Sequence, residues 1–316
     1  MKQFTFASHA FHTKKRKTRR EKFLDEMDTV VPWSTLRALL EPHYPTSGRR
    51  GRPPMALEMM LRVYFMQQWF GLSDEGIEDA LYEIESMRQF AGLELHDTAI
   101  PDATTVLKFR RRLEKHELTA AMFNAINAHL AERGVLLKGG TMVDATLIHA
   151  SPSTKNKAKQ RDPQMHQTKK GNQYYFGMKV HIGADVNSGA AHTACVTPAN
   201  TADITVMPKL MREDDRAVFG DAAYQKKADK QAARRAGVFY GVSLRGTKDR
   251  PLGAGNKRRN RKMSSVRARV EHVFRVMKCQ FGYRRVRYRG LAKNAAQVFT
   301  LLGLTNLYIS RRRLVA

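Results

Sequence analysis

The sequence predicts an α/β protein in which an all-α helical region precedes a region of mixed strands and helices. Hydrophobic residues recur at helical spacing as far as about residue 134, and short apolar runs rich in β-branched residues replace them afterwards. A length of 316 residues is sufficient for two domains. We therefore expect a basic arm with short helices over 1–50, a helical domain over 51–134, and an α/β domain over 135–316 with a basic insertion at about 245–263.

A large excess of positive charge limits the kinds of partner that the chain suits. It contains 56 Lys and Arg residues against 29 Asp and Glu, which gives a net charge of +27. A field of that size favours a polyanion, and nucleic acid is the first choice. An anionic membrane is the alternative, but no apolar run of about 18 residues is present, so no membrane span is expected.

Cysteine content and the N-terminal residues indicate the compartment. The chain has two cysteines, Cys195 and Cys279, and neither has a CxxC neighbour. This pattern argues against disulfides and zinc modules. The N-terminal MKQFTFASHAFHTKK lacks the apolar segment of a signal peptide. We therefore expect a protein of the reducing cytoplasm.

Two basic stretches in the N-terminal half are candidate DNA contacts. Residues 14–20, KKRKTRR, hold six cations in seven positions, including Arg16 and Arg19. They form either a solvated arm or an arm that binds phosphate. A later helix, capped by Asp102, turns its apolar residues inward and leaves cations outside, an arrangement typical of a helix-turn-helix-like bundle. Its candidate contacts are Lys108, Arg111 and Arg112, although any basic surface helix has a similar pattern.

A helix near the C-terminus combines one carboxylate with two cations. In RARVEHVFRVMK, residues 267–278, the side chains of Arg267, Glu271 and Lys278 share one helical face beside an apolar stripe. The simplest interpretation is a surface Arg–Glu pair at i,i+4 spacing. The alternative is a functional site, because a carboxylate at the edge of a buried face needs a cation or a metal beside it.

Two aspartates upstream favour the alternative. Asp144 interrupts an apolar strand and Asp221 ends a second one, so each needs donors, a cation or a metal. Either residue alone could be a structural aspartate. Together with Glu271 they suggest a hard-cation site, since carboxylate oxygens suit Mg²⁺ or Mn²⁺. Two such ions about 4 Å apart can activate a nucleophile and stabilise the leaving oxygen of a phosphodiester.

Long stretches of the chain resemble a known family. The sequence is similar to bacterial insertion-sequence transposases of the DDE class, and most similar to the family named after insertion sequence five. The likeness is carried by the following stretches: ALEMMLRVYFMQQWFGLSDEGIEDALYEI, VDATLIHASPSTKN, RDPQMHQTKKGNQYYFGMKVHIGADVNSG, GDAAYQ and RARVEHVFRVMKCQFGYRRVRYRGLAKNAAQ.

This resemblance implies a ribonuclease-H-like (retroviral-integrase-like) core with Asp144 on its first strand, Asp221 on its fourth and Glu271 on the following helix. It implies that these three acids are catalytic and bind the metal ions. Arg267 and Lys278 would contact phosphate near the scissile end. Ser264 stands where the fuller family motif has a tyrosine, so no tyrosine role is assigned to it. The basic insertion adds two further candidate DNA contacts, Arg258 and Arg259.

The resemblance also implies an activity and its partners. Water would attack at the transposon end and free a 3′-hydroxyl, which would then attack target DNA, without a covalent protein intermediate. The partners would be double-stranded DNA, as transposon ends and target, and a second copy of the chain. The protein would work in the bacterial cytoplasm, associated with the nucleoid when bound to DNA. Two alternatives remain open: a ribonuclease-H-like nuclease without strand transfer, and a catalytically inactive DNA-binding repressor.

Overall fold

The computed structural model describes residues 13–45, 53–94, 98–136, 139–247 and 249–315. The chain divides into two compact units. The first ends at Leu118, and the second runs from Thr119 to Leu314. Among the described residues, no helix is both long and apolar enough to cross a membrane.

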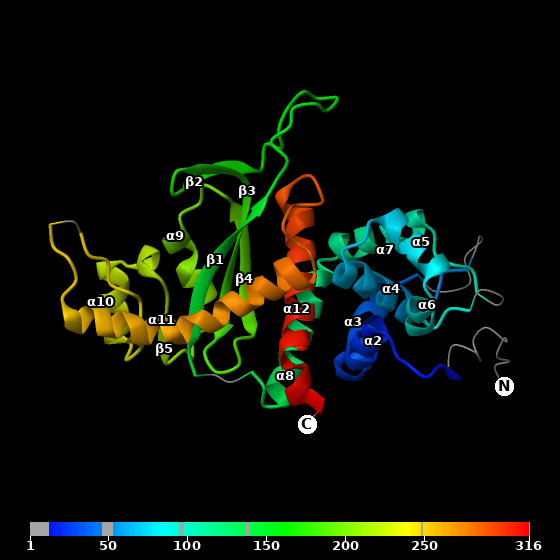
Figure 1. Cartoon of the computed structure of the whole chain (residues 1–316), viewed down its shortest axis with the longest axis horizontal. Helices are drawn as coiled ribbons and strands as arrows, with labels where there is room; N and C mark the ends of the chain where they lie inside the picture. Colours follow the sequence, from blue (N-terminus) through cyan, green and yellow to red (C-terminus); the bar gives the residue numbers. More distant parts are fainter. Residues whose placement is uncertain (1–12, 46–52, 95–97, 137–138, 248, 316) are drawn as a thin grey trace. The chain divides into compact units, whose positions relative to one another are not determined.

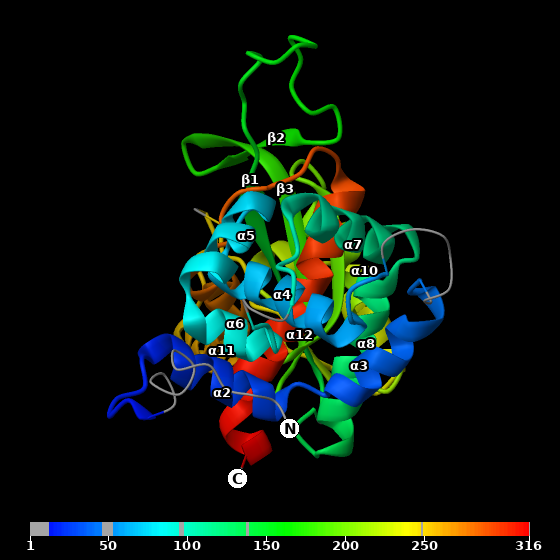
Figure 2. The same cartoon turned by 90° about the vertical axis from the view of Figure 1, so that its right-hand side faces the viewer.

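The first unit is helical, and one helix lies at its centre (Figures 1 and 2). This helix, α4, is buried on nearly every side, because it packs against α3, α5, α6 and α7. Aromatic rings fill the space around it, with the rings of Trp33 and Phe65 5.6 Å apart and those of Trp69 and Phe90 5.8 Å apart. The α-helices are α2 (Arg19–Val30), α3 (Trp33–Leu40), α4 (Leu57–Phe70), α5 (Asp74–Glu83), α6 (Glu85–Ala91) and α7 (Ala103–Lys115).

The helix boundaries of this unit follow local sequence signals. The hydroxyl of Ser73 accepts a hydrogen bond from the backbone of Gly76 and caps α5, and Asp102 caps α7 in the same way through Thr105. Gly71 ends α4 in the left-handed conformation, with φ of 65°. The cap at Asp102 confirms the prediction made from sequence.

The second unit contains a six-stranded mixed sheet (Figure 1). Its central strand, β1, pairs antiparallel with β3 along its whole length and parallel with β5 on its other edge. β6 continues the sheet parallel to β5, while β2 and β4 pair antiparallel with β3. The strands are β1 (Thr141–His149), β2 (His166–Lys170), β3 (Gln173–Asp185), β4 (Ala191–Pro198), β5 (Ala217–Phe219) and β6 (Phe239–Tyr240).

Helices of the second unit cover the sheet and complete its core. Residues of β1, β5 and α9, with Tyr224 and Val242, form a buried apolar cluster. α11 lies against β1 and β5 (Figure 1). Its last turn continues into a π-helix, Val276–Gln280. The α-helices are α8 (Leu118–Glu132), α9 (Asp203–Leu210), α10 (Lys227–Arg235), α11 (Ala254–Arg275) and α12 (Leu291–Val315).

Three features differ from the sequence expectations. α8, expected within a helical domain over 51–134, belongs to the second unit, because Phe123 packs 5.9 Å from Phe299 of α12. The expected basic insertion at 245–263 is half helix, since α11 already begins at Ala254. The polar segment before β3, for which no strand was predicted, contains β2, which is held by backbone pairing with β3 rather than by burial.

A buried ion pair joins α5 to α7 in the first unit. The guanidinium of Arg110 donates to Asp74 at 2.9 Å, and the side chains are 9% and 19% exposed. The amide of Gln67 donates to the same carboxylate at 2.7 Å. Breaking such a pair is costly, because the remaining partner stays buried without its counter-charge.

We expect Asp74→Ala to lower the free energy of unfolding by about 3 kcal/mol, the lower end for a broken buried pair, because Glu114 remains 3.7 Å from Arg110. The control is Asp25→Ala, which breaks the exposed pair with Lys17 and should cost less than about 1 kcal/mol. Urea unfolding of the full chain measures both. Equal losses in the two variants would contradict the structural role of the Asp74–Arg110 pair.

Candidate active site

The parallel pairing of β1 and β5 brings two aspartates to the same level of the sheet. Met142 of β1 is paired with Phe219 of β5. Asp144 and Asp221 each lie two residues beyond these partners along the same direction. Neighbouring strands lie about 4.8 Å apart, so the register alone places the two carboxylates close to each other.

A hollow of about 660 Å³ in the second unit collects these aspartates together with Glu271 of α11. Its wall contains cations as well as acids, so charges of both signs line one cavity. The charged residues that line it are Asp144, Asp203, Asp221, Glu271, Lys169, Lys170, Lys179, Arg267 and Lys278. The structure thus brings together five residues singled out from sequence, namely the three acids with Arg267 and Lys278.

Arg267 lies between two of the acids. Its Nη1 is 3.4 Å from Oδ2 of Asp144, and its Nη2 is 3.7 Å from Oε1 of Glu271. Its Nε is buried and has no hydrogen-bond partner among the described residues. The guanidinium is therefore held mainly by charge, at distances longer than a good hydrogen bond. Ser264 lies exposed on the same helix, one turn earlier.

The carboxyl of Asp144 is the most perturbed acid of the hollow. Its side chain is 17% exposed, and burial raises its pKa from 3.8 to about 6. The backbone N–H of Ala145, which donates to Oδ1 at 2.8 Å, and the charge of Arg267 oppose this rise in pKa. The negative charges of Asp221 and Glu271 increase it. Three acids thus interact at this point.

The other two acids are held differently. Asp221 is half-buried, and its Oδ1 accepts a hydrogen bond of 2.8 Å from the N–H of Ala223, which caps the short 3₁₀ helix Ala222–Tyr224. Glu271 has a side chain that is 64% exposed. One carboxylate is therefore held in the sheet, one is held at the start of a short helix, and one is largely exposed at the edge of its ion pair with Arg267.

The donor chemistry fits a hard divalent cation. The three carboxylates supply oxygen ligands of the kind that Mg²⁺ and Mn²⁺ prefer. Asp221 and Glu271 both raise the pKa of Asp144, so added positive charge at this place is electrostatically favourable. No three acidic, His or Cys side chains in the described part of the chain are grouped closely enough to hold one ion as they stand. Arg267 supplies the positive charge in this arrangement.

Lys278 is fixed to the strand that carries Asp144. It lies in the π-helix that follows α11, and its Nζ donates to the carbonyl of Leu147 at 2.8 Å. Burial is the first cause that lowers the pKa of Lys278, and the neighbouring charge of Lys170 is the second. The ammonium therefore points along β1 toward the hollow rather than into open solvent.

The hollow also contains residues that sequence analysis did not single out. Asp203 opens α9 and pairs with the ammonium of Lys179 at 2.8 Å. Thr168, Lys169 and Lys170 come from β2. An aspartate in the first turn of a helix resembles an ordinary dipole partner, and β2 has the polar sequence HQTKK, so neither carried a distinctive sequence signal.

The remaining candidate DNA contacts lie elsewhere. Lys108 and Arg111 are exposed on α7, and the guanidinium of Arg112 lies 5.5 Å from the ring centre of Tyr44. Arg16 and Arg19 are exposed at the start of α2, and Arg258 is exposed on α11. Arg259 instead donates to the carbonyls of Tyr240 and Val242, at 3.0 and 3.2 Å. It therefore fastens α11 to the sheet.

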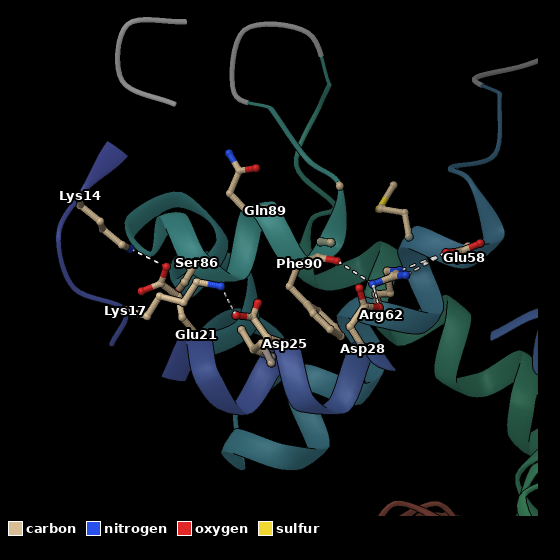
Figure 3. A pocket seen from close by; sticks show the side chains of 14 residues that line it. Lys14, Lys17, Glu21, Asp25, Asp28, Glu58, Arg62, Ser86, Gln89 and Phe90 are labelled. Carbon is tan, nitrogen blue, oxygen red and sulfur yellow. Dashed lines mark hydrogen bonds and ion pairs between the residues drawn. The ribbon is translucent and has the colours of Figure 1, made fainter. Parts of the chain in front are cut away.

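A second hollow, of about 640 Å³, lies in the first unit (Figure 3). Its charges are already paired with one another. Lys14 is 2.6 Å from Glu21, and Arg62 is 2.6 Å from Asp28 (Figure 3). Arg62 also stacks 4.2 Å from the ring centre of Trp33. These pairs stabilise the helical unit and make this hollow a weaker candidate than the one lined by Asp144.

Comparison with known families agrees with this geometry. A family described as the transposase DDE domain matches residues 136–307, more than half of the chain. A second, described as a transposase domain (DUF772), matches residues 11–112. The first match contains the three acids, Arg267 and Lys278. The chain therefore belongs to the insertion-sequence transposases with a DDE domain, enzymes that act on DNA.

Proposed function

We propose that the protein binds the terminal inverted repeats of its insertion sequence and catalyses metal-dependent DNA cleavage and strand transfer. We further propose that it belongs to the family named after insertion sequence five. The observation that carries the proposal is the hollow in which Asp144, Asp221 and Glu271 face Arg267 and Lys278. Acids that can hold cations and cations that can hold phosphate are the two requirements of phosphodiester chemistry.

The topology of the second unit supports a ribonuclease-H-like core. Two adjacent parallel strands, β1 and β5, carry or precede the aspartates, and α11 places the glutamate against them. The antiparallel strands β3 and β4 extend the sheet on the other side of β1. This arrangement supports a catalytic domain from about residue 135 that is preceded by a helical DNA-binding domain.

The three carboxylates would share two ions, either Mg²⁺ or Mn²⁺. We assign Asp144 to both ions, Asp221 to one and Glu271 to the other. When bound, the ions activate the attacking oxygen and stabilise the leaving oxygen of the phosphodiester. Asp144 suits the central role because its side chain is only 17% exposed and the charges of Asp221 and Glu271 both act on it. Glu271 suits a mobile role because its side chain is exposed.

Arg267 and Lys278 would position the scissile phosphate. Lys278 is held against Leu147, so its charge is fixed beside β1. Arg267 is bound to Asp144 and Glu271 through long ion pairs, which weaken once those carboxylates have another cation. Its guanidinium can then bind a phosphate through two N–H groups. Because Arg267 would leave the carboxylates when metal binds and then bind a phosphate, metal binding and DNA binding would be linked.

The exposed cations outside the hollow would add affinity for double-stranded DNA. α7 presents Lys108 and Arg111 on one face while Val106, Phe109 and Leu113 hold its other face in the core. Arg16, Arg19 and Arg258 are exposed as well. Arg112 and Arg259 make contacts within the protein and are weaker candidates. A homodimer that holds two transposon ends, working in the bacterial cytoplasm, completes the proposal.

We expect Asp144→Asn, Asp221→Asn and Glu271→Gln each to reduce cleavage of DNA that carries the element's ends to the level without protein. Each change removes a charged oxygen ligand and keeps the shape of the side chain. Affinity for the same DNA in EDTA should stay within about twofold, since the phosphate contacts remain. Arg258→Gln is the comparison variant, which should weaken binding without blocking cleavage at saturating protein.

The same assay separates the alternatives. A pre-cut end supplied with target DNA is joined to it only by a transposase. Cleavage without joined product identifies a nuclease, and binding without Mg²⁺-dependent nicking identifies a repressor. Cleavage by any acid variant at the rate of the unmodified protein removes that residue from the site.

We expect cleavage at a subsaturating Mg²⁺ concentration to fall as the pH drops through about 6. Only the charged form of Asp144 binds a metal, and burial raises the pKa of this carboxyl to about 6. The charged fraction, and with it the rate, should fall about tenfold per pH unit below that value. Rates measured from pH 5 to 8 test this, with DNA binding in EDTA as the control. A flat profile would show that the Asp144 carboxyl does not limit metal binding.

We expect Arg267→Gln to tighten Mn²⁺ binding in the absence of DNA, because the guanidinium competes with the metal for Asp144 and Glu271. Losing an ion pair worth about 1 kcal/mol corresponds to about fivefold in affinity. Isothermal titration calorimetry measures the Mn²⁺ affinity of each variant, with Arg269→Gln on the same helix as the control. Arg269 donates to the carbonyl of Val186 and does not line the hollow. Weaker Mn²⁺ binding by Arg267→Gln would disprove the competition.

A further inference from the structure

The hairpin of β2 and the first part of β3 is not explained by packing. Four of the five residues of β2 are exposed, and Gln173 and Tyr174 of β3 are exposed as well. Gly171 makes the turn between the strands with φ of 61°. One face of the pair is only half-buried, at Thr168 and Tyr175, and the other is mostly exposed, so the pair adds little to a hydrophobic core. Its residues are therefore available to a partner.

The side chains of this hairpin suit a nucleic-acid strand. Tyr174 is 64% exposed, one of few large apolar side chains in the described chain with that much contact with water. The ammonium of Lys169 lies 5.6 Å from the centre of its ring. Tyr175 faces His149, with ring centres 5.3 Å apart. Proteins that bind single strands hold the phosphates with cations and stack the bases on exposed aromatic rings.

The hairpin borders the hollow of the three acids. Thr168, Lys169, Lys170 and Tyr175 line that hollow. Residues 150–184 around them hold seven Lys and Arg against one acid, Asp162. The carboxylate of Asp162 already accepts hydrogen bonds from the backbone of Gly290, at 2.6 Å, and of Gln164, at 3.0 Å. The hairpin and the segment before it therefore carry a positive net charge.

We propose that the hairpin binds an unpaired DNA strand that leaves the hollow, with Lys169 and Lys170 on its phosphates and Tyr174 stacked on a base. The identity of this strand, as the end being cut or joined, rests on the proposed function. An unpaired strand is favoured over a duplex because Tyr174 offers a ring face, and bases in a duplex are already stacked on one another. A duplex ligand is an outcome that the experiment distinguishes.

The test measures binding of the full chain in EDTA to a fluorescein-labelled 20-nucleotide DNA strand and to its duplex. We expect Tyr174→Ala to weaken binding of the single strand about tenfold, the loss of one base–aromatic stack, and to leave duplex binding within about twofold. Tyr174→Phe keeps the ring and should bind like the unmodified protein. Tyr82→Ala is the matched control, since Tyr82 is a comparably exposed tyrosine on α5.

The lysines are tested through the salt dependence of binding. For a single strand, each phosphate contact contributes about 0.7 to the slope of log affinity against log salt concentration. The double variant Lys169→Ala, Lys170→Ala should therefore lower that slope by about 1.4. An unchanged slope, or equal loss of single-strand and duplex binding in Tyr174→Ala, overturns the inference.

The two proposals fail separately. If the acid variants lose cleavage while Tyr174→Ala binds the single strand like the unmodified protein, the proposed function stands and the role of the hairpin falls. If Tyr174→Ala loses single-strand binding while the unmodified protein neither cuts nor joins DNA, the hairpin binds a strand but the proposed function falls.

Discussion

The burial of one carboxylate, that of Asp144, is the constraint on which the second unit depends. A charged group in the middle of a sheet is costly unless positive charge accompanies it. α11 supplies that charge through Arg267, and it can do so because its apolar face packs on β1 and β5. The parallel register of the same two strands brings Asp221 alongside. The parallel strand pair, the position of α11 and the charge of Arg267 thus meet at Asp144, and together they form the hollow.

The three acids differ in ways that suit different tasks. Asp144 is fixed and desolvated, Asp221 is held by a backbone hydrogen bond, and Glu271 is largely exposed. A rigid ligand gives a metal a defined place, while a mobile ligand allows ions and DNA to enter and leave. The cations show the same division, with Lys278 fixed to a carbonyl and Arg267 held by longer ion pairs. The site therefore combines side chains held by hydrogen bonds, at Asp221 and Lys278, with an exposed carboxylate and a guanidinium held by longer ion pairs.

Sequence patterns were informative where chemistry is local. The caps Ser73 and Asp102, and the isolated aspartates in apolar strands, needed only neighbouring residues to be recognised. The roles of Asp144 and Asp221 as metal ligands stay predictions. β2 could not be foreseen, because its stability comes from pairing with a strand further along the chain. The structural role of Arg259 depends on carbonyls 17 and 19 residues away. Asp203 lines the hollow because α9 packs beside it, and no local sequence pattern predicts such tertiary packing.

The length of α11 determines how far apart two DNA contacts would lie in the proposed complex. An α-helix rises about 1.5 Å per residue, so Arg258 and Glu271 lie about 20 Å apart along its axis. DNA advances about 3.4 Å per base pair, so this span corresponds to about six base pairs. Arg259 and Asn260 fasten the early turns of the helix to the segment around β6, and the ion pairs of Arg267 fasten its later part to β1. For a duplex that runs along α11, the helix would hold a phosphate contact at Arg258 at a fixed distance from the bond cleaved near Glu271.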